Sequence, residues 1–384
     1  MKLHSFGTAV NVTRPIIGRV TTTLAAGSRA ESILFCPDSQ TLGETADYLA
    51  VVTSQQAPTW RCEVPLVYSV RHLDYLADGD VVQISPQGFV RTLYRKSSPH
   101  NFILFTDQCN SYCLMCSQPP KPIDDSHRLS EHYRLIDLID PETSALGITG
   151  GEPTLFKRSF VNFIRYCEEK LPDTSLHVLT NGRMFYYRQF AAELGAVRHH
   201  DLMLGIPLYS DVDSEHDFVV QAKGAFEETV IGFHHLARYE VPIEVRVVIH
   251  KQTYRRLPQL AQYISRNFPF AAHVALMGLE HTGFTNQNMD QLWIDPVEYQ
   301  DELRIATEIL ALSGLRVSIY NHQLCVLDRT LWPYSRQSIS DWKNVYAKEC
   351  EGCRVQDRCG GFFQTGLAKH SASIRAIIYE PETI

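Results

Sequence analysis

The sequence predicts an α/β fold in which a partial barrel of six βα units follows a small, mostly β domain and precedes a cysteine-rich region. Three observations lead to this prediction. Apolar runs alternate with helical patterns between residues 100 and about 315, short β-like runs precede residue 98, and seven of the ten cysteines fall into two groups. We therefore expect domains over residues 1–98, 99–314 and 315–384.

The first domain is predicted from short apolar runs separated by turn residues. The runs cover residues 33–35, 48–52, 66–70 and 81–84. Turn signals such as Asp78-Gly79-Asp80 and Pro86-Gln87-Gly88 break the pattern before it reaches helical length. This alternation is typical of a small β domain.

The middle region repeats a strand, a loop and a helix. Strand-like runs cover residues 102–106, 145–149, 176–180, 202–206, 244–249 and 273–277, and helical patterns cover 129–139, 157–170, 185–195, 225–239, 255–267 and 296–313. Parallel strands need such crossover connections, so we expect a parallel sheet with helices outside it. The length fits a partial barrel, in which active-site residues follow the C-terminal ends of the strands.

Composition narrows the class of protein. The chain has 384 residues, of which 44% are hydrophobic and 21% charged, as in a globular protein. A net charge of −7 and a pI of about 6.1 give no indication of nucleic-acid or anionic-membrane binding. There is no apolar run long enough for a membrane span, and the N-terminus lacks a signal-peptide core. We expect a cytoplasmic protein whose cysteines are ligands and not disulfides.

The first cysteine group follows the first strand of the middle region. Cys109, Cys113 and Cys116 form a C-x3-C-x2-C triplet within TDQCNSYCLMCSQPP. Three thiolates cannot form a paired disulfide set, and they are one ligand short of a closed tetrahedral site. Such a site leaves a metal position open for a small molecule. A zinc site completed by Asp107 or His127 is the alternative.

A second motif, Gly150-Gly151-Glu152-Pro153, follows the second strand. The glycines allow the backbone to approach a ligand closely, and carbonyl groups with a carboxylate suit the ammonium group of an amino acid. The four residues could also be a simple turn. Arg246, in the fifth strand, can pair with a carboxylate through its two-pronged guanidinium. Weaker candidates for contact with a substrate are Tyr209, His250, Glu280, His281 and residues 320–322.

The second cysteine group lies near the C-terminus. Cys350, Cys353 and Cys359 have the spacing C-x2-C-x5-C, and Cys325 lies upstream. Four thiolates can close around one metal centre. A structural zinc ion with four cysteine ligands, or free thiols, are the alternatives.

The cysteine triplet and the Gly-Gly-Glu-Pro motif together resemble the radical S-adenosylmethionine (SAM) superfamily. The resemblance implies that the three thiolates hold a [4Fe–4S] cluster whose fourth iron binds SAM. It also implies that Gly150, Gly151, Glu152 and Pro153 lie at the SAM amino group and that Ser210, after the fourth strand, bonds the ribose. Met115 stands where the superfamily usually has an aromatic residue near the adenine, and its thioether can fill the same apolar role.

The superfamily resemblance also implies a reaction. A one-electron donor, such as flavodoxin or ferredoxin, would reduce the cluster, and SAM would be cleaved to methionine and a 5′-deoxyadenosyl radical that takes hydrogen from a substrate. The spacing of the second cysteine group resembles SPASM or twitch modules, which implies one auxiliary [4Fe–4S] cluster held by Cys350, Cys353, Cys359 and Cys325.

Longer phrases resemble one family, the C-type radical SAM maturases of the His-Xaa-Ser system. They are CNSYCLMCSQPPK, LYSDVDSEHDFVVQAKGAFEETV, VALMGLEHTGF, YNHQLCVLD, SISDWKN and CGGFF. The resemblance implies a ribosomally made peptide or protein as substrate and a B-type partner maturase. A radical SAM enzyme for a small molecule, such as a nucleoside or cofactor precursor, is one alternative, and a non-catalytic metal-binding scaffold is another.

Overall fold

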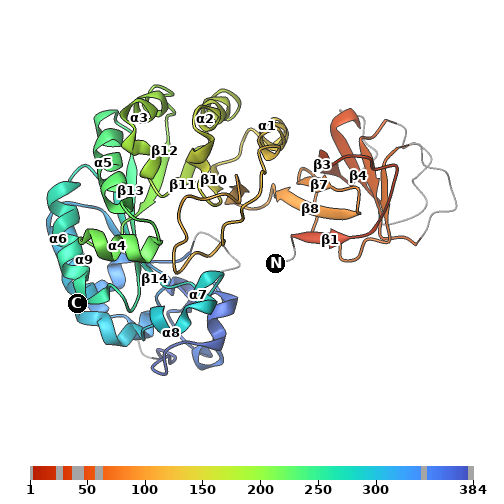
Figure 1. Ribbon diagram of the computed structural model, residues 1–384. Helices are drawn as coiled ribbons and strands as arrows, with labels where there is room; N and C mark the ends of the chain where they lie inside the picture. Colours follow the sequence, from red (N-terminus) through yellow and green to blue (C-terminus); the bar gives the residue numbers. More distant parts are fainter. Residues whose placement is uncertain (1–2, 23–28, 37–46, 57–63, 339–343, 379–384) are drawn as a thin grey trace.

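Two sheets organise the chain in the computed structural model, which describes residues 3–22, 29–36, 47–56, 64–338 and 344–378. Each sheet has eight strands. In Figure 1 the first sheet forms a β unit to one side of a larger α/β unit, and helix α1 lies between them. This is the mixed α/β fold with a small N-terminal β region that the sequence predicts.

The first sheet has the order β1-β8-β7-β3-β4-β5-β6-β2. Only Gly7 separates β1 from β2, so one nearly continuous strand pairs with β8 at its start and with β6 at its end. The sheet thereby closes on itself. All four expected runs are strands, and β1, β2, β3 and β8 are additional. The strands are β1 (His4–Phe6), β2 (Thr8–Val10), β3 (Ile16–Thr21), β4 (Ser32–Phe35), β5 (Ala50–Val52), β6 (Leu66–Tyr68), β7 (Val81–Ile84) and β8 (Phe89–Tyr94).

The second sheet is parallel throughout and runs in chain order from β9 to β16. The six expected strands are its first six members. Two more strands continue the sheet past residue 314, the expected end of the middle domain. The strands are β9 (Asn101–Leu104), β10 (Ala145–Thr149), β11 (Ser175–Leu179), β12 (Leu202–Pro207), β13 (Ile243–Ile249), β14 (His273–Gly278), β15 (Val317–Tyr320) and β16 (Ser335–Arg336).

Helices connect these strands and cover the outer face of the sheet (Figure 1). The longer helices fall where helical patterns are expected, whereas α4, α7 and α8 are additional. The α-helices are α1 (Arg128–Leu138), α2 (Arg158–Lys170), α3 (Arg188–Gly195), α4 (Asp213–Val220), α5 (Ala225–Arg238), α6 (Leu257–Asn267), α7 (Phe284–Gln287), α8 (Met289–Leu292) and α9 (Gln300–Leu312). In the described parts of the chain, no helix has the length and apolar character needed to cross a membrane.

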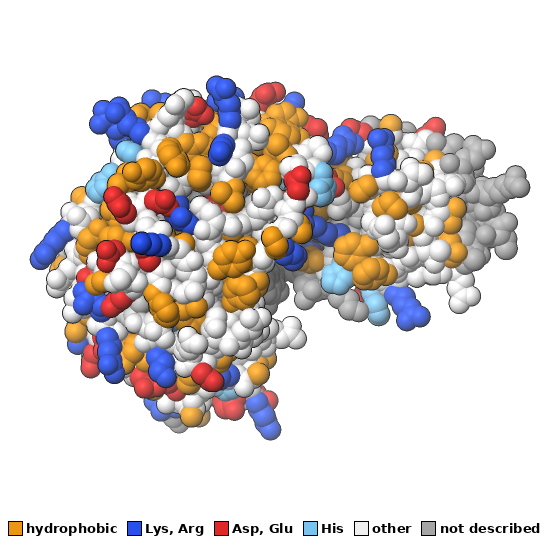
Figure 2. Space-filling model, viewed as in Figure 1, with side chains coloured by type: hydrophobic (Ala, Val, Ile, Leu, Met, Phe, Trp, Pro, Cys, Tyr) orange, Lys and Arg blue, Asp and Glu red, His pale blue; other side chains and the backbone are white. Residues whose placement is uncertain are grey.

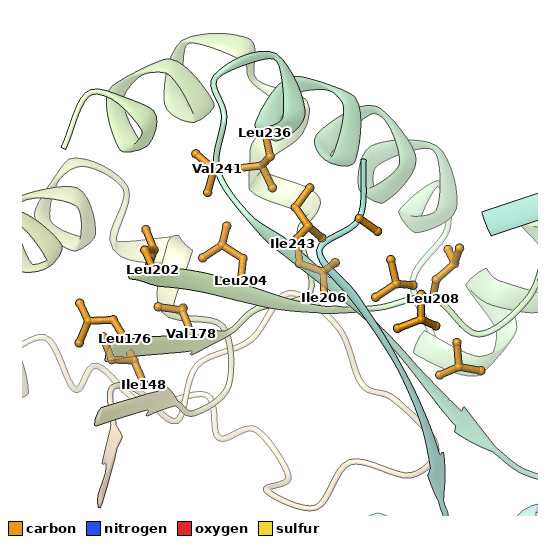
Figure 3. Close-up of a cluster of buried hydrophobic side chains, with 14 of the residues drawn as sticks. Ile148, Leu176, Val178, Leu202, Leu204, Ile206, Leu208, Leu236, Val241 and Ile243 are labelled. Carbon is orange, nitrogen blue, oxygen red and sulfur yellow. The ribbon is translucent and has the colours of Figure 1, made fainter. Parts of the chain in front are cut away.

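Side chains that pack against the helices alternate along each strand with side chains that point the other way. The second sheet therefore has a packed face and an inner face. Leu176 and Val178 of β11, and Leu204 and Ile206 of β12, belong to the buried cluster against the helices. Figure 3 shows these side chains stacked between the strands and the helix that carries Leu236. Because neighbouring residues of a strand point to opposite faces, the intervening residues face the inside of the barrel. The inner face therefore supplies the site described below.

Polar contacts join the β unit to the α/β unit. The Arg19 guanidinium donates to the carbonyl of Leu138, at the end of α1, with Nη2 at 2.9 Å. The hydroxyls of Tyr94 and Thr143 lie 2.8 Å apart. Because Tyr94 also belongs to the large buried cluster of the α/β unit, the two units share packed side chains.

Candidate functional site

A cavity of about 230 Å³ lies at the C-terminal ends of the parallel strands. Its wall includes residues from both predicted motifs and from the inner face of the barrel. The sequence-predicted residues that it brings together are Cys109, Cys113, Met115, Cys116, Gly150, Gly151 and Arg246. Glu152, Pro153 and Ser210 do not line it.

The loop that carries the three cysteines is held by side chains from several other segments. Arg183 donates to the Asn110 carbonyl and, at 3.1 Å, to the Ser111 hydroxyl. On the far side of the loop, Asn288 Nδ2 donates to the Leu114 carbonyl at 2.8 Å. These contacts fix the backbone around the thiols without using the sulfur atoms.

The three cysteines are half-buried, and their thiols are close enough to influence one another. Burial raises the pKa of Cys109 to about 12, and the neighbouring Glu152 and Cys116 add to the effect. Burial also raises the pKa of Cys113 and Cys116, and the other two thiols contribute at Cys113. The protein alone therefore favours neutral thiols, and a bound cationic centre is needed to turn them into thiolates.

Two backbone segments approach each other so closely at Gly150 and Gly151 that a side chain would not fit at either position. The Gly151 N–H donates to the Thr106 carbonyl at 2.7 Å, and the Glu152 N–H donates to the Gln108 carbonyl at 2.7 Å. A Cβ on Gly150, whose φ is +145°, would lie 2.4 Å from the Thr106 oxygen, and one on Gly151 would lie 2.0 Å from that of Gln108. The glycines thus allow the motif to pack directly against the residues that precede Cys109.

The Glu152 side chain points into the protein and is completely buried. One carboxylate oxygen accepts from the Thr154 N–H and hydroxyl and from the Thr180 hydroxyl, and the other accepts from the Asn181 N–H at 2.6 Å. Burial raises the pKa of this carboxyl group, and the hydrogen bonds oppose that effect. The contact with a ligand ammonium group stays a prediction, and in this geometry the carboxylate joins the loops after β10 and β11.

Arg246 lines the cavity from the inner face of β13. Its Nη1 donates at 2.6 Å to Glu244, which lies two residues earlier on the same face. Glu244 is also bonded to His273 Nδ1 at 2.7 Å. On the neighbouring strand, a Cβ on Gly205 would lie 3.0 Å from Arg246 Cδ, so the glycine leaves room for the arginine. Sequence reasoning missed Glu244, although its i, i+2 spacing from Arg246 was a usable signal.

Ser210 lies outside the cavity wall. Its hydroxyl donates to Glu215 at 2.6 Å and accepts from the Val212 N–H at 3.2 Å, so it organises the start of α4. The expected bond to a ribose is not favoured by this arrangement and stays a prediction. Pro153 begins a short 3₁₀ turn, as its fixed φ allows.

The weaker candidates occupy different places. Tyr209, Glu280 and Asn321 line the main cavity, and His281 lines a smaller neighbouring cavity with Asn321. Burial raises the pKa of Tyr209 well above its ordinary value, and the cysteine thiols add to this. His250 is buried with no hydrogen-bond partner at either ring nitrogen within the described chain.

The second cysteine group also comes together. Burial raises the pKa of Cys325, Cys350 and Cys359, and in each case other thiols of the group add to the effect. Backbone N–H groups donate to two of the sulfurs, from Leu324 to Cys359 and from Ile377 to Cys353, both at 3.4 Å. Such bonds are found at sulfur ligands of iron–sulfur centres.

Residues 103–264 match the family model of the Radical SAM superfamily. The chain carries a radical SAM domain. The matched segment begins in β9 and ends in α6, so it contains the cysteine triplet, the Gly-Gly-Glu-Pro motif and Arg246. A search of curated proteins found none that matches the chain.

Several solved structures are similar to this chain at low sequence identity. Native anSMEcpe with bound AdoMet is 14% identical with a TM-score of 0.50, and the match covers 72% of this chain and 92% of that one. SuiB from Streptococcus suis, bound to its precursor peptide SuiA, is 14% identical with a TM-score of 0.44 over 59% of this chain. The chain spans about half of SuiB, 49% in that structure. HemN from Escherichia coli, a coproporphyrinogen III oxidase, has a TM-score of 0.44 and 14% identity over 56% of this chain and 52% of its own.

A radical SAM domain implies a [4Fe–4S] cluster and SAM, and the main cavity has suitable donors for both. Three half-buried thiols share one wall, and the Arg246 cation lines the same cavity. Among the described residues, no three His, Cys, Asp or Glu side chains converge as they would on one metal ion. Each thiolate of a four-iron cluster binds a different iron, so its ligands need not converge in this way. The triplet fits a cluster better than the single zinc ion considered as the alternative.

Proposed function

We propose that this radical SAM enzyme modifies a ribosomally made peptide or protein by hydrogen abstraction, as a C-type maturase of the His-Xaa-Ser system. The observation that supports the radical reaction is the single cavity shared by Cys109, Cys113, Cys116, the Gly150-Gly151 backbone and Arg246. It combines a place for a cluster with groups suited to an amino acid carboxylate and ammonium.

The residues of the chain have distinct tasks in this proposal. Cys109, Cys113 and Cys116 hold the [4Fe–4S] cluster, which supplies the electron for reductive cleavage of SAM. Arg246 binds the SAM carboxylate, and the carbonyl groups after β10 bind its ammonium group. Met115, which is 8% exposed and packs beside Tyr209, offers an apolar surface to the adenine. The surrounding hydrogen bonds keep the loops in place.

A polypeptide substrate is supported by the shape of the molecule. The β unit and the α/β unit border a second cleft of about 260 Å³, which runs along strand β9. Strand β9 is an edge strand of its sheet. Exposed strand edges are where extended peptides add to folded proteins. A substrate confined to the main cavity would have no use for this surface.

An auxiliary [4Fe–4S] cluster belongs to the same proposal. Cys325, Cys350, Cys353 and Cys359 provide four ligands, and backbone N–H groups are already directed at two of the sulfurs. Such a centre would accept an electron after hydrogen abstraction, which favours a net oxidation of the substrate. A flavodoxin or ferredoxin as electron donor and a B-type partner maturase complete the proposed system.

The test of the radical reaction is anaerobic reconstitution with iron and sulfide, followed by reduction and addition of SAM. Methionine and 5′-deoxyadenosine are the expected products, and Cys113→Ala should abolish both. Cys167→Ala is the matched control, because Cys167 is a buried helical cysteine outside both groups. Cleavage of SAM by the Cys113 variant at the wild-type rate would contradict the cluster assignment.

The substrate class needs a separate measurement. Candidate polypeptides containing His-Xaa-Ser repeats would be incubated with the reduced enzyme and examined by mass spectrometry. Deuterium transfer from a labelled polypeptide into 5′-deoxyadenosine supports the proposal. Transfer only from a small molecule, such as a nucleoside, would replace it with the alternative.

Metal analysis tests the second cysteine group. We expect about eight irons per reconstituted chain, corresponding to two four-iron clusters, and about four in Cys325→Ala. The Cys325 variant should still cleave SAM, because its group is separate from the main cavity. One zinc per chain that disappears in this variant would instead show a structural zinc site.

A further inference from the structure

The second cleft lies between the two units and away from the SAM cavity. Its walls come from β1 and β8 on one side and from β9 and α1 on the other, with a volume of about 260 Å³. Strands β8 and β9 are joined by residues 95–100 but do not pair with each other. The cleft therefore opens between two consecutive strands that belong to different sheets.

Strand β9 presents its edge to this cleft. Phe102, Ile103 and Leu104 all line it, although consecutive side chains of a strand point to opposite faces. A cleft that touches three consecutive residues runs along the strand edge. Within the described chain β9 pairs only with β10, so its other edge is available for backbone hydrogen bonds.

The cleft also carries an arginine that has no salt-bridge partner among the described residues. Arg91 and Arg128 both line it, with Glu131 as the one carboxylate of its wall. Arg128 is paired with Asp107 at 2.8 Å and with Asp125 at 3.3 Å, whereas no carboxylate in the described chain lies within salt-bridge distance of Arg91. Burial and the nearby Arg128 lower the pKa of Arg91, and Glu131 and Asp107 oppose this only from beyond salt-bridge distance. An acidic ligand in direct contact would therefore stabilise the guanidinium charge.

An aromatic group forms the rim next to Arg91. The rings of Phe6 and Phe89 lie 4.7 Å apart, and Phe6 is 62% exposed. The His4 ring lies beside them, 5.6 Å from that of Phe89 and tilted by 42° against it. Figure 2 shows apolar and histidine side chains side by side on the β unit, near where it meets the α/β unit. Exposed aromatic clusters of this kind mark surfaces that bind a partner.

We propose that this cleft binds an extended acidic peptide segment, which pairs with the free edge of β9 and places a carboxylate at Arg91. The segment also carries an apolar side chain against Phe89. This inference rests on the proposed function, because it assumes a polypeptide substrate. It adds that the substrate is recognised by a segment outside the reaction cavity, through charge and strand addition.

The test uses the full-length reconstituted enzyme and a phage-displayed library of random twelve-residue peptides. Selection on the wild-type chain should enrich peptides with Asp or Glu among alternating β-branched or aromatic residues. Selection on Arg91→Glu should instead enrich Lys or Arg at the same position. Arg71→Glu makes the same charge change on an exposed residue of the β unit outside the cleft, and it should select the wild-type set.

Synthetic copies of one enriched peptide give the affinity. We expect at least a tenfold loss for Arg91→Gln, about 1.4 kcal/mol, and no loss for Arg71→Gln. Arg91→Gln loses both the repulsion from Arg128 and the attraction of Glu131 and Asp107, so the thermal unfolding midpoint of each variant is measured to show that it is folded. No enrichment above beads alone, no acidic bias, or equal selection by wild type and Arg91→Glu would each overturn the proposal.

The outcome is separable from that of the proposed function. Formation of 5′-deoxyadenosine without acidic-peptide selection would leave the radical reaction standing and remove only the peptide cleft. Selection of acidic peptides by a protein that never cleaves SAM would remove the enzymatic proposal and retain the cleft.

Discussion

The backbone N–H of Asn181 donates a 2.6 Å hydrogen bond to the buried carboxylate of Glu152. This contact links the loop after β11 to the motif after β10. Asn181 Nδ2 in turn donates to the side-chain oxygen of Asn110, in the cysteine loop, at 2.6 Å. Three consecutive strand ends of the radical SAM domain are therefore connected through one carboxylate and one asparagine.

Glu152→Gln should destabilise this junction. The carboxylate accepts four hydrogen bonds, and an amide placed there must direct its NH₂ group at Asn181 or at the Thr154 and Thr180 donors. A buried donor left without an acceptor costs about 1–3 kcal/mol. We expect that loss in the free energy of unfolding measured by urea denaturation. Glu142→Gln, on an exposed residue, should change it little, and an equal effect of both variants would contradict the role of Glu152.

Gly151→Ala should displace the cysteine loop. The added Cβ would lie 2.0 Å from the Gln108 carbonyl oxygen, so one of the two backbones must move. We expect a reconstituted protein that folds but holds clearly less iron at the triplet, as measured by iron content in a Cys325→Ala background. Gly314→Ala is the control, since its Cβ meets nothing within 4 Å and it carries only the strain of a φ of +81°. Full iron content in Gly151→Ala would show that the contact is dispensable.

Much of the fold follows from patterns that the sequence displays directly. The six expected strands are apolar runs of the length typical of buried parallel strands, and each is a strand in the structure. Strand β15 was missed because Ser318 interrupts its apolar run, Val317 to Tyr320, on the inner face. Strands β1 and β2 were missed because each has three residues, too few for a recognisable period.

The candidate site was predictable in its residues but not in their orientations. Spacing alone placed Cys109, Cys113 and Cys116 on one loop, and strand order placed Gly150 and Arg246 beside them. Whether Glu152 and Ser210 face the cavity depends on which donors and acceptors the fold places around each side chain. Thr180, which is 28 residues away, donates a hydrogen bond to the Glu152 side chain, whereas Ser210 donates one to the nearby Glu215. Such competition for hydrogen bonds is a tertiary property.

Arg246 and Glu244 should act as a unit in SAM binding. Arg246→Lys keeps the charge but loses the guanidinium fork, and a hydrogen bond to a charged group contributes about 1.5–3 kcal/mol. We expect the Kd for SAM to rise at least tenfold in equilibrium dialysis with the reconstituted protein. Glu244→Gln should produce a smaller rise, because the arginine remains but its 2.6 Å anchor is weakened.

The control and the contrary result for this pair are specific. Arg316→Lys changes an arginine outside the cavity, where it contacts the Ala272 carbonyl, and should leave the Kd for SAM unchanged. Arg246→Lys with wild-type affinity would show that Arg246 does not contact the SAM carboxylate. A rise for Glu244→Gln larger than that for Arg246→Lys would mean that Glu244 acts through the barrel as a whole.

Acid should destabilise the protein through buried histidines. Burial lowers the pKa from 6.5 to about 4 at each of four residues, His132, His216, His250 and His322. As the pH falls from about 6.5 to 4, the unfolded chain takes up protons that the folded chain does not, so the free energy of unfolding falls. Each histidine contributes a slope of up to about 1.4 kcal/mol per pH unit in that range.

His132→Gln isolates one of these contributions. The Nε2–H of His132 donates a 2.9 Å hydrogen bond to the Phe105 carbonyl and its ring stacks on the Phe105 ring, so the variant also loses some stability at pH 7.5. Its free energy of unfolding should nevertheless fall less steeply than that of wild type between pH 6.5 and 4. The difference in slope should equal the contribution of one histidine. His127→Gln, on an exposed residue just before α1, should keep the wild-type slope. Urea denaturation at several pH values measures both, and parallel curves for wild type and His132→Gln would show that His132 titrates equally in the folded and unfolded chains.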